Sequence, residues 1–157
     1  MDTARRGTLL ERYRQGYDAV LAALEGITPA ELDARPAPSE FTAREVVHHL
    51  ADSEMTSAIR LRKLIAEDEP IIDGYDENGF ARRLYYAARP IEPSLDALRA
   101  ARATTASILE HLTEAEWARA GTHSESGRYS VETWLEIYAA HAHEHADQIR
   151  RARGSVA

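Results

Sequence analysis

The sequence predicts an all-α protein, a four-helix bundle with one long crossover between its second and third helices. Three observations support this fold class. Four segments of about 20 residues place apolar residues at intervals of three and four, the spacing of one face of an α-helix. No segment with the alternating pattern of a β-strand exceeds a few residues. A long irregular segment, residues 69–92, separates the second helical segment from the third.

Length and composition limit the classes of protein that fit. At 157 residues the chain is too short for two ordinary domains, so we expect one bundle domain over residues 1–157. It has no cysteine, which excludes disulfides, thiolate metal ligands and a cysteine nucleophile. The net charge of −7 argues against a nucleic-acid partner, which requires a basic face. Because neither a membrane span nor a signal-peptide stretch is visible, we expect a cytoplasmic protein that does not bind membranes.

The first helix is predicted by an apolar stripe that ends near Gly26. The residues of this stripe are Leu10, Tyr13, Tyr17, Val20, Leu21 and Leu24. Thr28 then caps a short extra turn that has Pro29 at its first position.

The second helix is predicted to begin after Thr42 and to run to about Ala66. The sequence TARE matches a capping box, in which the side chains of Thr42 and Glu45 bond to each other's backbone N–H groups. The inward stripe, which is polar in its middle, consists of Val46, Leu50, Ser53, Ser57, Leu61 and Leu64. In the crossover that follows we expect a short helix around residues 77–87. A connection this long usually covers something or carries function.

Pro93 and Ser94 are predicted to open the third helix, and Ser130 to cap the fourth, which runs to Arg153. The stripe of the third helix is Leu95, Leu98, Thr105, Leu109 and Leu112. The stripe of the fourth is Val131, Trp134, Leu135, Tyr138, Ala142 and Ile149. Between these helices TEAEW predicts a Thr-led turn and HSESGRYS a hairpin-like loop.

Five histidines lie in the second and fourth helices, and a helical wheel separates them. At about 100° per residue, His141 and His145 fall on or beside the apolar stripe of the fourth helix, whereas His143 falls on the far side. On the second helix His49 lies at the edge of the stripe and His48 points nearly opposite to it. We therefore expect His49, His141 and His145 to face inward, and His48 and His143 to lie at the surface.

Two histidines four residues apart on one helix can reach a single ion, and a third from a facing helix completes three nitrogen ligands. Three neutral ligands leave coordination positions open, as in catalytic metal sites. Imidazole suits Zn²⁺, Ni²⁺, Fe²⁺ or Cu²⁺, and the sequence does not choose among them. The alternative is that the inward histidines are core residues bonded to backbone carbonyls or neighbouring side chains, and the pattern alone does not decide between the two.

Three stretches, in this order and spacing, resemble the DinB/YfiT-like superfamily of metal-binding four-helix bundles: FTAREVVHHLADSE, GYDENGFA and SGRYSVETWLEIYAAHAHEHADQI. The most specific pieces are the histidine directly before Leu-Ala-Asp and the pattern H-x-x-x-H-x-x-Q-I. Matched position by position, the family's three metal ligands fall on His49, His141 and His145, the three that the wheel selects. The resemblance implies a divalent transition metal, with Zn²⁺ or Ni²⁺ as the expected ion, and a homodimer.

Residues beside these histidines are candidates for supporting roles. Glu45 and Asp52 flank His49 by about one turn, so either could orient its second ring nitrogen. Against this, Glu45 has its capping box to form and Asp52 could be solvated. Tyr138, one turn before His141, could line a pocket or belong to the core.

Loop residues supply three further candidates. Tyr75 and Asp76 belong to the crossover, which could fold over the open side of the metal, and Asp76 could equally cap the short helix there. His123, in the loop before the fourth helix, could be a fourth ligand or a proton carrier, although most loop histidines are neither. We assign no role to His111, at the end of the third helix.

The resemblance implies an enzyme acting on a small molecule, and two chemistries fit the three ligands. A transferase would use a low-molecular-weight thiol, such as bacillithiol or mycothiol, as cosubstrate and attack an electrophile. A metal-dependent hydrolase would use a water made more acidic by the ion. We favour the transferase slightly, because Glu144 lies off the apolar stripe and no inward carboxylate on the fourth helix can act as a base. The third possibility is a non-catalytic metal-binding stress or sensing bundle.

Overall fold

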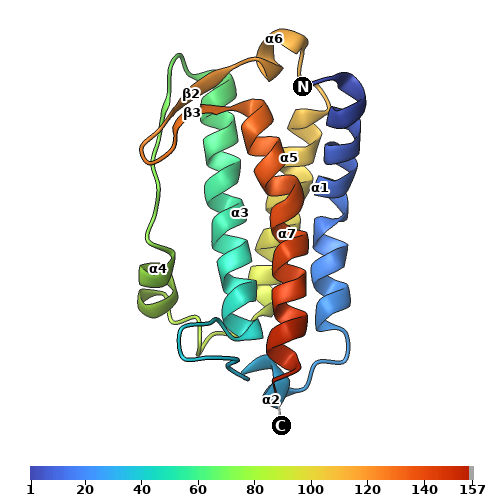
Figure 1. Ribbon diagram of the computed structural model, residues 1–157, viewed down its shortest axis with the longest axis vertical. Helices are drawn as coiled ribbons and strands as arrows, with labels where there is room; N and C mark the ends of the chain where they lie inside the picture. Colours follow the sequence, from blue (N-terminus) through green and yellow to red (C-terminus); the bar gives the residue numbers. More distant parts are fainter. Residues whose placement is uncertain (156–157) are drawn as a thin grey trace.

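Four long helices lie side by side in the computed structural model, which describes residues 1–155 (Figure 1). They are α1 (Thr3–Leu24), α3 (Ala43–Ala66), α5 (Glu92–Leu109) and α7 (Val131–Arg153). Helices α1 and α3 each pack against both α5 and α7, so they occupy opposite corners of the bundle. The predicted four-helix bundle is confirmed. Among the described residues, no helix has the length and apolar character needed to span a bilayer.

The shorter elements include a small sheet near one end of α3 (Figure 1). They are α2 (Pro29–Leu32), β1 (Ile71–Ile72), α4 (Glu77–Arg83), α6 (Glu114–Trp117), β2 (Ala120–His123) and β3 (Gly127–Ser130). The hairpin of β2 and β3 matches the loop predicted before the last helix, but β1, which pairs with β2 in parallel, was not predicted. Two residues are too few to show an alternating pattern. The crossover is thus fixed to the hairpin at one end and packs on α3 through α4 at the other.

Side-chain caps set the predicted starts of most helices. Thr42 Oγ1 accepts from the backbone N–H of Glu45, and the Glu45 carboxylate accepts from the backbone N–H of Thr42. The capping role expected for Glu45 is therefore confirmed. Thr28 caps α2 and Ser130 caps α7 in the same way: each residue has an extended backbone, and its side chain accepts from the backbone N–H three residues further on. Helix α5 begins at Glu92, one residue earlier than predicted, and has no side-chain cap.

The predicted inward stripes of α3 and α7 are buried throughout, but that of α1 is partly wrong. Leu21, which belongs to the predicted inward stripe, is 40% exposed, whereas Gly16, which does not belong to it, is buried. Helix α1 approaches its neighbours through small residues, and a Cβ on Gly16 would lie 2.8 Å from the Cβ of Ala142. A stripe identified by large apolar side chains misses such a position.

A buried charged group joins α1, α3 and α5 inside the bundle. Arg102 Nη1 lies 2.6 Å from Glu54 Oε2, and both side chains are almost fully buried. The Tyr13 hydroxyl donates to the other oxygen of Glu54 at 2.5 Å, and the guanidinium lies 4.0 Å from the centroid of the Tyr13 ring. The polar middle that the sequence predicts for α3 therefore adjoins a paired charge, which only the assembled bundle brings together.

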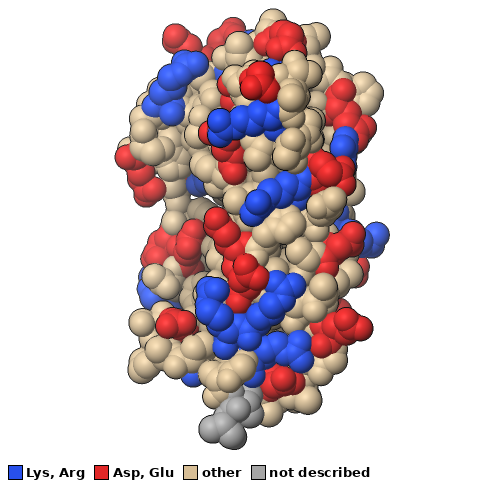
Figure 2. All heavy atoms as spheres, turned by 45° about the vertical axis from the view of Figure 1, so that its right-hand side comes forward, with Lys and Arg blue, Asp and Glu red and all other residues tan. Residues whose placement is uncertain are grey.

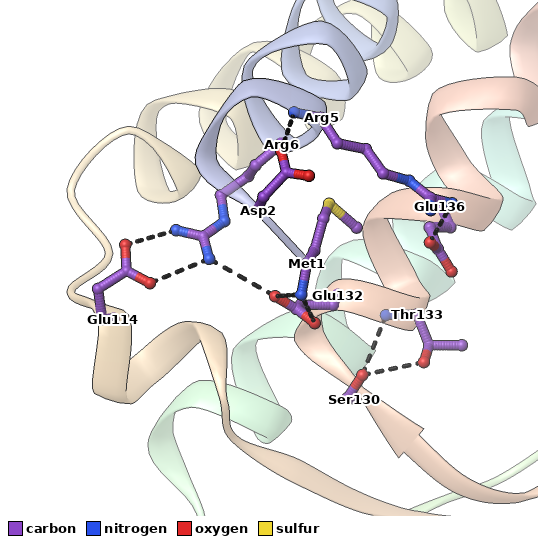
Figure 3. A network of polar contacts seen from close by, with 9 residues as sticks. All are labelled: Met1, Asp2, Arg5, Arg6, Glu114, Ser130, Glu132, Thr133 and Glu136. Atoms are coloured by element: carbon purple, nitrogen blue, oxygen red, sulfur yellow. Dashed lines mark hydrogen bonds and ion pairs between the residues drawn. The ribbon is translucent and has the colours of Figure 1, made fainter.

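Ion pairs tie the start of α1 to α6 and α7 (Figure 3). The N-terminal amino group donates to Glu132 at 2.9 Å, and Arg6 lies 2.7 Å from Glu114 and 3.5 Å from Glu132. On the face shown in Figure 2, acidic and basic side chains are interspersed over much of the surface, and several basic side chains adjoin one another in its lower part.

Candidate metal centre

Three histidines meet between α3 and α7. One ring nitrogen from each of His49, His141 and His145 lies within 4.8 Å of the other two. The ring centroid of His49 is 5.5 Å from that of His141 and 4.7 Å from that of His145, and the two α7 rings are 4.5 Å apart. The spacing of four residues puts both α7 imidazoles on the side that packs against α3. The structure thus groups the three histidines that the wheel selects.

Burial and mutual repulsion hold these imidazoles neutral. Burial lowers the pKa of His49 and of His145 to about 4. It lowers the pKa of His141 to about 2, with further lowering by the two neighbouring histidines, because adjacent positive charges disfavour each other. A neutral imidazole offers the lone pair that a metal ion requires. The donor set is therefore in the form that binds metal at neutral pH.

His141 differs in its hydrogen bonding from an ordinary core histidine. His145 Nδ1–H donates to Gln148 Oε1 at 2.6 Å, which leaves the lone pair on Nε2. His141 Nδ1 is buried with no partner among the described residues, a situation that costs on the order of 1–3 kcal/mol. A satisfied core histidine would have found a carbonyl or hydroxyl. The arrangement therefore fits a divalent transition metal ion.

Gln148 is the residue of this centre to which the sequence assigned no role. It stands in the quoted pattern H-x-x-x-H-x-x-Q-I, three residues after His145. On a helix, that spacing brings two side chains into contact. The signal was therefore present, but an amide three residues from a histidine is too common to indicate a function without the geometry.

The candidates next to the histidines lie close by, with different contacts. Asp52 accepts a hydrogen bond of 2.5 Å from the Tyr86 hydroxyl, and its charge raises the pKa of His49 without offsetting the effect of burial. It forms no hydrogen bond with His49 among the contacts of the described residues. The Tyr138 ring centroid lies 5.5 Å from that of His141, and the side chain is 5% exposed. Tyr138 therefore both belongs to the core and adjoins the centre.

The two candidates in the crossover, Tyr75 and Asp76, have different roles in the fold. Asp76 accepts from the backbone N–H of Gly79 at 2.8 Å and so caps α4. The Tyr75 ring packs against Phe80 at a centroid distance of 4.8 Å. Helix α4 also places the charge of Glu77 close enough to raise the pKa of His145. These contacts place the crossover beside the histidines.

The remaining loop and surface candidates lie outside the three-histidine group. His123, in β2, accepts at Nδ1 from the backbone N–H of Glu125 at 3.2 Å. His143 is half-buried, with Nε2 2.9 Å from the backbone oxygen of Arg12. His111 is exposed just beyond the end of α5. None of the three adds a ligand atom to the group.

His48 is fully buried, so the prediction of a surface position is wrong. Its Nδ1 lies 2.8 Å from Ser94 Oγ, its Nε2 lies 3.3 Å from the backbone oxygen of Arg89, and its ring centroid is 5.4 Å from that of Tyr86. The wheel considered only the side of α3 that faces α7. The end of the crossover and the start of α5 cover the other side, and a histidine with two polar partners suits that position.

A cavity of about 620 Å³ lies between the segment before α3 and the region of α4, and the three histidines are not among its lining residues. Phe41 lines this cavity, and its ring centroid lies 6.0 Å from that of His49. Ala81 and Tyr85, from α4 and the turn after it, form part of the opposite wall. The volume is typical of small-molecule sites.

Fold and site define a four-helix bundle with a three-histidine cluster suited to a metal ion. The DinB superfamily profile matches residues 12–149, and the chain belongs to this superfamily. A "putative metal-dependent hydrolase" of Oceanobacillus iheyensis is 39% identical over 119 residues, 76% of this chain and 69% of that protein. One from Geobacillus thermodenitrificans is 31% identical over 142 residues, 89% of this chain and 79% of that protein.

A solved structure shares the whole architecture. It is that of YfiT from Bacillus subtilis, described as "a probable metal-dependent hydrolase with an unusual four-helix bundle topology". The TM-score is 0.90 at 26% sequence identity, and the match covers 97% of this chain and 87% of the other.

Proposed function

We propose that the protein is a metal-dependent enzyme whose ion is held by His49, His141 and His145. The observation that carries this proposal is the group of three neutral imidazoles with nitrogens within 4.8 Å of one another. The relatives named as metal-dependent hydrolases support it. These three residues would hold a divalent ion, which would make a bound water or thiol more acidic. Zn²⁺ and Ni²⁺ both suit the donor set.

The side chains around the histidines can orient the ligands and accept a proton. Gln148 fixes the His145 ring through its hydrogen bond. Glu77 is exposed at the first turn of α4, and its charge, like that of Glu144 on α7, raises the pKa of His145. A carboxylate there can accept a proton from a nucleophile. Glu77, which comes from the crossover, is the proposed base for hydrolysis.

Transfer of a low-molecular-weight thiol to an electrophile is the second candidate. The chain has no cysteine, so a thiol nucleophile has to arrive with a cosubstrate. The cavity of about 620 Å³ lined by Phe41, whose ring packs near His49, offers room for such a molecule. A non-catalytic metal-binding bundle is less well supported, because the ligand group of the described residues contains no fourth member that would seal the ion.

Turnover assays with matched variants test the proposal. Protein loaded with Zn²⁺ or Ni²⁺ is compared with chelator-treated protein on activated esters and amides, and on 1-chloro-2,4-dinitrobenzene with small thiols. We expect turnover in one of the two assays that needs the metal and disappears in His145→Ala. Glu77→Gln should lower hydrolysis, while Glu136→Gln, an exposed glutamate of α7 that pairs with Arg5, should leave it unchanged. Turnover that is insensitive to metal and to His145→Ala would contradict the proposal.

A further inference from the structure

Unpaired polar atoms gather beside the histidine centre. Five buried side-chain nitrogen or oxygen atoms have no hydrogen-bond partner among the described residues, and three of them belong to His141, Tyr75 and Arg60. Buried polar groups in folded proteins are nearly always paired. When several unpaired ones occupy one place, a ligand that supplies the missing partners is the simplest physical explanation.

These groups come from α3, α7 and the crossover. Along α3, Ser53 follows His49 by one turn and Arg60 follows two turns later on the same face. From α7, Tyr138 lies one turn before the first histidine of the centre. The charge of Arg60 and the hydroxyl of Ser53 each lower the pKa of both Tyr75 and Tyr138, against the opposing effect of burial. The four side chains are therefore near neighbours, and Tyr138 connects them to the centre through its ring contact with His141.

The crossover holds Tyr75 in this place. An Arg60 guanidinium N–H donates to the backbone oxygen of Asp73, and the Gly74 N–H donates to Ser124 Oγ at 3.1 Å. The Tyr75 ring centroid lies 5.8 Å from the Arg60 guanidinium carbon. The segment is thus tied both to α3 and to the hairpin, so the Tyr75 ring is held beside Arg60.

The Arg60 charge has no counterion. No carboxylate of the described residues lies within ion-pair distance of its guanidinium, although its Nε is buried. Arg102, the other arginine with a buried unpaired Nε near the centre, is neutralised by Glu54 at 2.6 Å. An arginine that is partly buried, unneutralised and close to unpaired hydroxyl donors favours an anion with planar oxygens.

We propose that Arg60 and Tyr75 form an anion site for a carboxylate or similar oxyanion group of the substrate. The Arg60 Nε–H and the Tyr75 O–H donate to its oxygens, while the reacting end of the same molecule lies at the histidines. The placement of the reacting end rests on the proposed function, whereas the anion site rests on the unpaired donors alone. The substrate class is therefore a small molecule with an anionic group near its reacting bond.

Benzoate and its neutral analogue benzamide probe this site by titration calorimetry, with Zn²⁺-loaded and with metal-free protein. We expect benzoate to bind both forms and benzamide to bind much more weakly. Loss of a charge-assisted hydrogen bond in Arg60→Gln should weaken benzoate binding by about tenfold or more. Tyr75→Phe should weaken it less, and Arg60→Lys should retain part of the affinity.

Arg62→Gln is the matched control, because Arg62 lies on the same helix and donates to Ala58 O and Thr105 Oγ1. Thermal unfolding and metal content are measured for each variant. Equal binding of benzoate and benzamide, no binding of benzoate by either form, or unchanged affinity in a folded Arg60→Gln variant would overturn the anion site. Absence of metal from the wild type would count against the proposed function alone, since the comparison in metal-free protein would still stand.

Discussion

His145 and Gln148 are joined by a hydrogen bond of 2.6 Å, in which the imidazole Nδ1–H donates to the side-chain amide oxygen less than one turn further along α7. The bond fixes the tautomer and leaves Nε2 free to face the other two histidines. A histidine that binds a metal usually donates its second N–H in this way. The chain's own amide group thus orients this ligand.

Replacement of this amide should weaken metal binding without unfolding the protein. We expect Gln148→Ala to lower metal affinity by about 10–100-fold, because the His145 ring loses its fixed orientation. Competition with a chromophoric chelator measures the affinity. Arg151→Ala, an exposed residue on the same helix, should bind metal as the wild type does. Equal affinities in the two variants would show that the hydrogen bond is irrelevant to the centre.

The metal-free protein should lose stability as the pH falls. The pKa of His49 and of His145 is lowered to about 4, from about 6.5 in an unfolded chain. The unfolded state therefore binds more protons than the folded state between these values. The free energy of unfolding should be greatest above pH 6.5 and fall toward pH 4, on the order of 1 kcal/mol per pH unit for each histidine.

Urea unfolding of chelator-treated protein at several pH values measures this dependence. His141 is also buried neutral, with a pKa of about 2, so it should contribute over the same range. His141→Leu should consequently show a shallower dependence than the wild type. A free energy of unfolding that stays constant between pH 6.5 and pH 4 would contradict the neutral, buried state of the cluster.

His48, the histidine next to His49, should contribute to the stability of the fold but not to metal affinity. His48→Ala removes the partner of Ser94 Oγ and of the Arg89 backbone oxygen inside the fold. We expect a loss of about 1–3 kcal/mol in the free energy of unfolding, with metal affinity within twofold of the wild type. Denaturant unfolding and metal titration check the two parts separately. Loss of metal from a folded His48→Ala protein would mean that the ligands are wrongly assigned.

Removal of one charge from the buried pair should be costly. Glu54→Gln leaves the Arg102 charge uncompensated in the core, so we expect a loss of about 3–5 kcal/mol in the free energy of unfolding. Glu136→Gln, which breaks the exposed pair with Arg5, should change stability little. Denaturant unfolding compares the two variants. Similar losses in the free energy of unfolding for the two variants would show that the buried Glu54–Arg102 pair contributes no more to stability than the exposed Arg5–Glu136 pair.

Much of the fold and the composition of the histidine cluster could be predicted from local pattern. The cap and stripe of α3 and the i, i+4 pair on α7 depend on residues close in sequence, where helical geometry alone determines which side chains share a face. That is why the sequence alone is enough to select His49, His141 and His145.

The misses all concern contacts between distant segments. The burial of His48 depends on Arg89 and Ser94, more than 40 residues away, and no wheel of α3 contains them. The close approach at Gly16 depends on small residues of α7, and the parallel pairing of β1 depends on the hairpin. Side-chain direction around the centre, such as that of Gln148 and Tyr75, likewise follows only from the assembled bundle.

Metal content by elemental analysis of purified, untagged protein tests the central claim most directly. The set comprises the wild type, His49→Ala, His141→Ala, His145→Ala and the control His143→Ala, which lies on the same helix outside the cluster. We predict about one ion per chain in the wild type and the control, and loss of the ion in the other three. Absence of metal after reconstitution, or its retention in all three cluster variants, would contradict the assignment of the metal centre.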